Sequence, residues 1–364
     1  MKWNWQQSDW PLWRYDTAVL EPLERQFLLG SGRLRGVWDY LSQTDREKVQ
    51  IELLSSEAIK TSEIEGQMLD RDSVQSSIRR QFGMQVDRRA GPAESGMAEL
   101  MVACFRDFGA PLSHESLFGW HRLVCRGRTD LREVGAYRSH PEPMQVVSGP
   151  VYRPKVHFQA PPSESVPAEM EAFINWLGAA DLPALAKAAL VQLYFVSIHP
   201  FEDGNGRLGR ALSEKVLAQL LGQPSLLALS RQIEKKRKGY YDALADNNRE
   251  MDVTGWVEWF GQTALEAQQY SNDLMDLVIA KTKLLDRLRG AINPRQQKAL
   301  LRLFDAGPEG FIGGLSASNY RSITGAPAAT ARRDLSDLVD KGALTRTGEK
   351  RGTRYWLNTT TASS

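Results

Sequence analysis

A run of twelve residues, HPFEDGNGRLGR, extends from His199 to Arg210 and combines a histidine, acidic residues and two arginines with glycines. Imidazole is the side chain whose ordinary pKa suits a general base near neutral pH. Residues three apart share one face of a helix, so Arg207 and Arg210 can both reach one polyphosphate. Asp203 supplies the hard oxygen ligand that Mg²⁺ prefers. The spacing therefore predicts a phosphate-binding loop that carries its own base.

Helical sequence on both sides must position this loop. The stretch 182–198 is rich in Ala and Leu and contains no breaker, which predicts a buried helix that Pro200 stops at His199. Residues 203–206 form a turn, and helical spacing resumes over 207–221. The N–H groups at the start of a helix attract phosphate. The alternative, an ordinary turn beside a helix-capping histidine, is disfavoured because every element of a nucleotide site is present in order.

The run from His199 to Arg210 matches the motif H-x-F-x-D/E-G-N-G-R-x-x-R, so the chain resembles the Fic family of protein adenylyltransferases. The resemblance implies that His199 deprotonates a Ser, Thr or Tyr hydroxyl of a target protein, which attacks the α-phosphate of ATP. It also implies that Asp203 holds Mg²⁺ and that Phe201 is a buried anchor. Catalysis of this kind depends on positioning and charge stabilisation. The loop residues that the resemblance assigns to nucleotide binding are Asp203, Gly204, Asn205, Gly206, Arg207, Leu208, Gly209 and Arg210.

A second helical segment lies upstream of this loop. Residues 44–47 (TDRE) have the pattern of a capping box, and helical spacing continues to Glu65, where Gly66 supplies a stop. Glu65 falls on the apolar face of this helix. A carboxylate there needs a cationic partner unless it reaches solvent at the helix end. The positions that recur on this face are Ile51, Leu54, Ala58, Thr61 and Glu65.

Residues 61–66 (TSEIEG) fit the Fic inhibitory signature S/T-x-x-x-E-G/N. The resemblance implies that this signature, with Thr61, Glu65 and Gly66, is inhibitory. Glu65 would pair with Arg210 and block the position of the γ-phosphate. The chain then resembles the Fic class whose inhibitory helix precedes the catalytic core. Tryptophans are dense before this helix, which predicts a segment that docks onto the core. They are Trp3, Trp5, Trp10 and Trp13.

Two further segments are expected to border the nucleotide. Short runs at 145–147 and 156–158 flank a turn at 148–150, which predicts a β-hairpin. Its position matches the Fic flap, which would bind a target segment as an added strand. A solvent-exposed hairpin without this role is the alternative. The flap residues expected beside the nucleotide are Val156, His157, Phe158 and Gln159.

Tyr240 and Asn248 stand two helical turns apart and follow a basic run. In the Fic pattern, a Tyr and an Asn at this spacing contact the nucleoside. A surface helix with core tyrosines is the alternative.

The C-terminal part has the order of a separate module. A helix over 265–288 is followed by a break at Asn293-Pro294, where new helical spacing begins. Segments 315–323 and 330–342 follow in helix-turn-helix order around a turn at 325–327, and a pair of strands lies near 343–345 and 355–357. This order resembles a winged helix, a common DNA-binding module. Residues that would meet phosphates are Arg332, Arg333, Lys350, Arg351 and Arg354. Acidic residues dilute this basic set, which favours protein contact or self-association over DNA. They are Asp334, Asp337, Asp340 and Glu349.

Composition limits the number of domains and the classes of protein to which this chain can belong. The chain has 364 residues, a formal net charge of +2 and two cysteines. This length suits two or three domains, and the charge is too small for the whole chain to bind nucleic acid. Two cysteines fit a reducing cytoplasm, and we expect neither a membrane span nor a signal peptide. Motifs of P-loop ATPases and kinases are missing from the sequence.

We therefore expect a mainly α-helical protein in four parts. Residues 1–95 form a Trp-rich region with the inhibitory helix, 96–262 the Fic catalytic core with its flap, 263–292 a helical linker and 293–364 a winged helix. The expected function is autoinhibited transfer of AMP from ATP, with Mg²⁺, to hydroxyl-bearing target proteins and to the chain itself. Hydrolytic removal of AMP, and a DNA-bound regulator whose core senses nucleotide, stay open. A target protein and a second copy of the chain are the expected partners.

Overall fold

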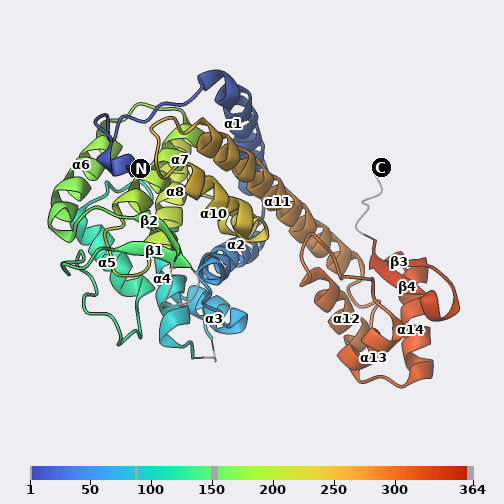
Figure 1. Cartoon of the computed structure of the whole chain (residues 1–364). Helices are drawn as coiled ribbons and strands as arrows, with labels where there is room; N and C mark the ends of the chain where they lie inside the picture. The colour runs from blue at the N-terminus through green and yellow to red at the C-terminus, as the bar shows by residue number, and fades with distance from the viewer. Residues whose placement is uncertain (1, 87–88, 149–154, 359–364) are drawn as a thin grey trace. The chain divides into compact units, whose positions relative to one another are not determined.

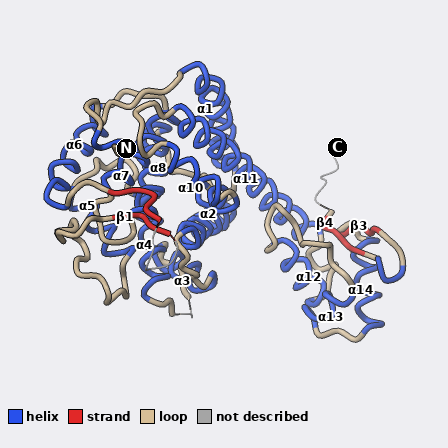
Figure 2. The backbone as a smooth tube through the Cα atoms, in the orientation of Figure 1, coloured by secondary structure: helices blue, strands red, loops and turns tan. Residues whose placement is uncertain are grey.

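The computed structural model describes residues 2–86, 89–148 and 155–358, and they are mainly helical (Figure 1). The strands form two separate two-stranded antiparallel sheets (Figure 2). The helices are α1 Thr17–Tyr40, α2 Gln43–Ile64, α3 Arg71–Gln81, α4 Pro92–Arg106, α5 His114–Val124, α6 Val166–Ala179, α7 Ala184–Ile198, α8 Asn205–Leu221, α9 Leu229–Lys235, α10 Arg237–Asp246, α11 Thr254–Arg287, α12 Pro294–Phe304, α13 Ala317–Thr324 and α14 Ala328–Asp340. The strands are β1 Gln145–Ser148, β2 Lys155–Gln159, β3 Leu344–Thr347 and β4 Arg354–Leu357.

The chain divides into two compact units. One contains residues 1–35 and 50–269, and the other contains 36–49 and 270–364. Helices α1, α2 and α11 each contribute residues to both units. The predicted boundary at 262/263 falls inside α11, and the four predicted domain ranges stay a prediction. None of the described helices has the length and apolar composition that crossing a membrane requires.

Helices α7 and α8 pack along each other in the first unit. Nearly every side chain of α7 is buried, as its apolar sequence on all faces requires. The helix ends as predicted at His199, which adopts a left-handed conformation with φ 52°. Helix α8 begins at Asn205, two residues before the predicted start. The reason is that Gly204 takes φ 85°, which a glycine adopts without strain, so the turn is shorter than expected.

The two ends of α2 compare differently with the sequence prediction. The capping box predicted at 44–47 is wrong, because Thr44 lies inside the helix and Ser42 Oγ accepts the N–H of Asp45 at 3.1 Å. At the other end, Gly66 takes φ 80° and the N–H of Gln67 donates to the Ser62 carbonyl at 2.9 Å. The predicted stop at Gly66 is therefore confirmed.

The hairpin predicted before α6 is present as β1 and β2. These strands pair antiparallel with an irregularity between Val146 and Val147. The predicted turn residues at 149–150 lie outside the described residues. Phe158 is buried under the hairpin, with its ring 5.4 Å from that of Trp3. Trp5 Nε1 donates to the Gln159 carbonyl at 2.7 Å, so the N-terminal segment docks on the core as predicted.

In the C-terminal unit, α12, α13 and α14 precede the β3–β4 pair, which is the predicted order of elements. The assignment to the winged-helix class stays a prediction. Asp334 on α14 is buried and accepts hydrogen bonds from Arg295 Nε at 2.9 Å and Tyr320 Oη at 3.0 Å. Asp337 accepts from Gln296 Nε2 at 2.7 Å and pairs with Lys341. Two of the four acidic residues expected to dilute the basic surface are thus engaged within the fold.

Candidate functional site

His199 stands at the C-terminal end of α7 and is half-buried as a residue. Its Nδ1 lies 3.2 Å from the Val196 carbonyl, so an Nδ1 proton donated there leaves Nε2 as the basic nitrogen. Burial lowers the pKa of His199 to about 4, which keeps the ring neutral at neutral pH. Arg138, which the sequence analysis did not assign, donates from Nε to the His199 carbonyl at 2.7 Å. The imidazole of His199 is therefore neutral, with Nδ1 held by the Val196 carbonyl.

The inner side of the loop is closed by packing and hydrogen bonds. Phe201 is fully buried and stacks on His121 at 4.1 Å, which confirms it as an anchor. Asn205 uses both polar side-chain atoms on the backbone of Phe201, at 2.8 and 3.0 Å. His121 Nδ1 accepts the N–H of Gly135 at 2.9 Å, so its Nε2 donates to the Asp203 carbonyl at 3.1 Å. The Asn205 side chain thus shapes the loop, and its predicted role in anion binding stays a prediction.

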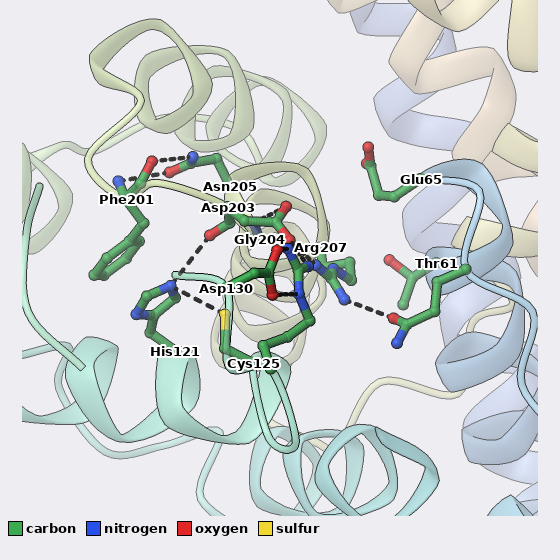
Figure 3. A network of polar contacts seen from close by, with 12 residues as sticks. Thr61, Glu65, His121, Cys125, Asp130, Phe201, Asp203, Gly204, Asn205 and Arg207 are labelled. Atoms are coloured by element: carbon green, nitrogen blue, oxygen red, sulfur yellow. Dashed lines mark hydrogen bonds and ion pairs between the residues drawn. The ribbon is translucent and has the colours of Figure 1, made fainter. Parts of the chain in front are cut away.

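Asp203 lies at the centre of a charged network (Figure 3). Its Oδ1 accepts the Gly204 N–H at 2.6 Å, and its Oδ2 lies 2.5 Å from Arg128 Nη1 and 3.1 Å from Arg207 Nη2. Burial raises the pKa of Asp203, but the arginines and the Gly204 N–H outweigh it and lower the pKa overall. Arg207 also donates from Nη1 to Gln67 Oε1 at 2.7 Å. Asp203 is therefore ionised and already paired.

The predicted Mg²⁺ ligand does not fit a divalent cation in this arrangement. Two guanidinium groups face the single negative charge of Asp203. Within the described residues, no cluster of three or more His, Cys, Asp or Glu side chains is placed to hold a metal ion. Mg²⁺ prefers near-octahedral oxygen ligands, several of which would come from substrate phosphates and water. The assignment of Asp203 to Mg²⁺ stays a prediction.

Arg210 and Glu65 form the contact between α8 and the end of α2. Arg210 is 1% exposed, and its Nη2 lies 2.8 Å from Glu65 Oε1 and 2.8 Å from the Thr61 carbonyl. Its Nε donates to Thr61 Oγ1 at 2.8 Å. A Cβ on Gly206 would meet Glu65 Oε1 at 2.1 Å, so this carboxylate lies against the first turn of α8. Glu65 thus puts negative charge where a helix N-terminus favours an anion.

The residues expected around the nucleoside are only partly brought together. Tyr240 is buried on α10, and its hydroxyl accepts from Gln192 Nε2 at 2.8 Å and lies 3.4 Å from Arg210 Nη1. Helix α10 ends at Asp246, so the expectation that Tyr240 and Asn248 share one helix is wrong. The Asn248 carbonyl instead accepts the N–H of Asn4 at 2.8 Å.

The hairpin residues expected to border the nucleotide have contacts of their own. His157 Nε2 lies 2.6 Å from Ser148 Oγ, and Gln159 Oε1 accepts from Gln145 Nε2 at 3.0 Å. Val156 is exposed. Roles in nucleotide binding for these residues, and for Leu208 and Gly209 in α8, stay predictions.

Sequence reasoning missed residues that complete the site. Tyr241 places its hydroxyl 3.2 Å from the Ile64 carbonyl and 3.5 Å from Glu65 Oε2. Arg128, Gln67 and His121 contact the loop from segments outside its motif. The segment 135–138, to which no role was assigned from the sequence, supplies Arg138.

Two sequence families match this chain. Residues 111–217 match the Fic/DOC family, and this range includes the loop from His199 to Arg210. Residues 3–84, which include Glu65, match a domain of unknown function, DUF4172. The match to the Fic/DOC family thus contains the loop, and the match to the second family precedes it in the sequence.

Two relatives that are named as protein adenylyltransferases match part of this chain. A probable protein adenylyltransferase of Aquifex aeolicus (strain VF5) is 36% identical over 63 residues, 17% of this chain and 20% of the relative. The protein adenylyltransferase Fic of Nematostella vectensis is 34% identical over 132 residues, 35% of this chain and 27% of the relative. The chain thus matches only about a fifth to a quarter of the length of these relatives.

A solved structure shares the fold. The crystal structure of a Fic family protein from Desulfovibrio desulfuricans G20 has a TM-score of 0.54 at 22% sequence identity, covering 97% of this chain and 99% of that chain.

Proposed function

We propose that this protein is an autoinhibited protein adenylyltransferase. His199 Nε2 would take the proton of a Ser, Thr or Tyr hydroxyl on a target protein or on the chain itself. The hydroxyl oxygen would form a bond to the α-phosphorus of ATP, and the bond to the β-phosphate oxygen would break to release pyrophosphate. The Fic/DOC match at 111–217 and the neutral, oriented base at His199 support this reaction. Loop N–H groups and the two arginines would stabilise the phosphates.

The observation that carries the proposal is the 2.8 Å contact between Glu65 Oε1 and Arg210 Nη2. A guanidinium group that binds the outer phosphates of ATP must be available to them. Arg210 instead donates from Nε and Nη2 to Thr61 and Glu65, and Arg207 donates from Nη1 and Nη2 to Gln67 and Asp203. The site is therefore held in a form that admits the nucleotide poorly, and loss of Glu65 should release Arg210.

The test is label transfer from ATP to protein, in the purified chain and in a lysate, by the parent, Glu65→Gly and His199→Ala. We expect label from α-³²P-ATP to rise in Glu65→Gly and to vanish in His199→Ala. Label from γ-³²P-ATP should stay at background, because AMP is transferred and the γ-phosphate leaves. Transfer of the γ-label would contradict the proposal. Loss of AMP from labelled protein when the parent is added would instead assign AMP removal to the same site.

The C-terminal unit supports a second candidate function, the binding of duplex DNA. Arg332, Arg333 and Arg346 are exposed and make no ion pair with any described residue, whereas Asp334 and Asp337 are engaged inside the unit. Two of the four acidic residues that disfavoured DNA binding, Asp334 and Asp337, therefore have cationic partners within the unit. The exposed arginines of α14 and the β3–β4 pair give a basic surface of the kind that binds phosphates.

Fluorescence anisotropy with a duplex would test this surface at several salt concentrations. We expect R332A/R333A to weaken binding and to flatten its salt dependence. R289A/K298A removes the same charge elsewhere in the unit and is the matched control. Equal binding by both double variants, or no binding by the parent, would contradict a DNA-binding role for α14. Contact with protein or self-association would then be preferred.

A further inference from the structure

Arg128 belongs to the loop after α5 and has no part in the motif or in the roles that the family resemblance assigns. Its guanidinium group bridges two carboxylates. Nε and Nη2 each lie 2.6 Å from an oxygen of Asp130, and Nη1 lies 2.5 Å from Asp203 Oδ2. The same Oδ2 also accepts from Arg207 Nη2 at 3.1 Å. Arg128 thus brings a second positive charge to the carboxylate that was expected to hold Mg²⁺.

We propose that Arg128 takes the place of the divalent cation at Asp203 and must leave before a cation can bind there. This inference rests on the proposed nucleotide site. Oδ1 accepts the Gly204 N–H and Oδ2 accepts from both arginines, so much of the oxygen surface of Asp203 is in use. A carboxylate that already faces two guanidinium groups offers little net attraction for a dication.

Arg128 is the arginine that can move. Its side chain is 37% exposed. When Arg128 leaves Asp203, it keeps a bidentate ion pair with Asp130, so its positive charge always has a partner. Arg207 is 4% exposed and is tied to Gln67 on its other side. Arg128 can move from contact with both Asp130 and Asp203 to contact with Asp130 alone. No buried charge loses its partner in this movement, because Asp203 keeps Arg207. The arrangement makes the cation affinity of the site depend on this single exposed side chain.

The affinity of the full chain for ADP, measured by calorimetry in excess Mg²⁺ and again in EDTA, tests the inference. The ratio of the two dissociation constants reports how strongly the cation assists nucleotide binding. We expect a ratio near one in the parent, because Arg128 already neutralises Asp203. In Arg128→Gln, the ratio should rise about fivefold in favour of Mg²⁺, the size expected for a partly exposed ion pair.

Three variants separate competition from other effects. Arg128→Lys keeps the charge and should keep the ratio of the parent. Arg126→Gln removes the same charge from the same loop, but Arg126 pairs with Glu99 at 2.6 Å, so the ratio should not change. Adding Asp203→Asn to Arg128→Gln should return the ratio to that of the parent.

Two outcomes would overturn the inference, and they are distinguishable. Equal ratios in the parent and Arg128→Gln, with ADP bound by both, would reject competition at Asp203 and leave the nucleotide site standing. Failure of every variant to bind ADP would reject the proposed function and this inference with it.

Discussion

The side chain on which the proposed chemistry depends is His199, and burial rather than a charged partner sets its protonation state. Its pKa is lowered to about 4, as is that of His121. An unfolded histidine titrates near 6.5. The unfolded chain therefore binds more protons between these values. The contribution of these two neutral rings to the free energy of unfolding is complete above about pH 6.5. It is lost as the pH falls toward 4.

We predict that two of the five histidines titrate with midpoints near pH 4. Two-dimensional NMR of the imidazole resonances would measure this, with His199→Ala and His121→Gln assigning the signals. Arg138 and the Val196 carbonyl hold His199 in either protonation state, so the fold around it should persist. Midpoints near 6.5 for both rings would show that they are solvated and that His199 is not held neutral by burial.

Thr61 is the residue whose hydroxyl supports the buried Arg210. Thr61→Val keeps the shape but removes the acceptor of Arg210 Nε, so it should lower the free energy of unfolding by about 1–3 kcal/mol. Thr61→Ser keeps the hydroxyl and should cost clearly less. Urea unfolding of the two variants gives the comparison. Equal stabilities would mean that the 2.8 Å hydrogen bond adds nothing to the position of Arg210.

The sequence could indicate the residues of the loop but not the residues that contact the loop from other segments. His199, Asp203, Arg207 and Arg210 are recognisable because their spacing is local. Arg128 and Tyr241 reach the site only through tertiary packing, and neither stands in a pattern that marks a partner. The Glu65–Arg210 pair was expected from the family signature, and the apolar helix face alone required only some cationic partner.

Helices α2 and α8 meet where the end of α2 contacts the start of α8. Gly206 leaves room for Glu65, because a Cβ there would meet Glu65 Oε1 at 2.1 Å. Gly206→Ala should therefore destabilise the parent, but in the Glu65→Gly background the obstacle is absent. We predict a coupling free energy of about 1 kcal/mol between the two substitutions in a double-mutant unfolding cycle. Additive effects would show that the carboxylate does not lie against this turn.

Helix ends were predictable where backbone chemistry alone decides them. Pro200 and Gly66 stopped α7 and α2 at the expected residues. The start of α2 was misplaced because two hydroxyl residues, Ser42 and Thr44, both suit a cap, and the structure uses Ser42. Helix α10 ends at Asp246, where no glycine or proline marks the end. The sequence pattern therefore predicted a helix that continues to Asn248.

For the whole molecule, the two compact units should respond separately to a substitution inside one of them. Asp334 accepts hydrogen bonds from Arg295, Tyr320 and Asn293 within the C-terminal unit. Asp334→Ala leaves these donors without their shared acceptor. We predict that amide hydrogen exchange speeds up at least about tenfold in α12, α13 and α14, while α7 and α8 keep their protection. Equal loss of protection in both units would contradict this independence.

The measurement that tests the central claim most directly is the rate at which the purified chain gains AMP, followed by intact-protein mass spectrometry. Glu65→Gly is compared with Glu63→Gly, which removes the same charge two residues earlier, in the last turn of α2, from a residue that pairs with Lys60. Release of Arg210 should raise the rate in Glu65→Gly by at least about tenfold, while Glu63→Gly stays at the rate of the parent. Equal rates in the two variants, or no gain of AMP in either, would contradict inhibition by Glu65.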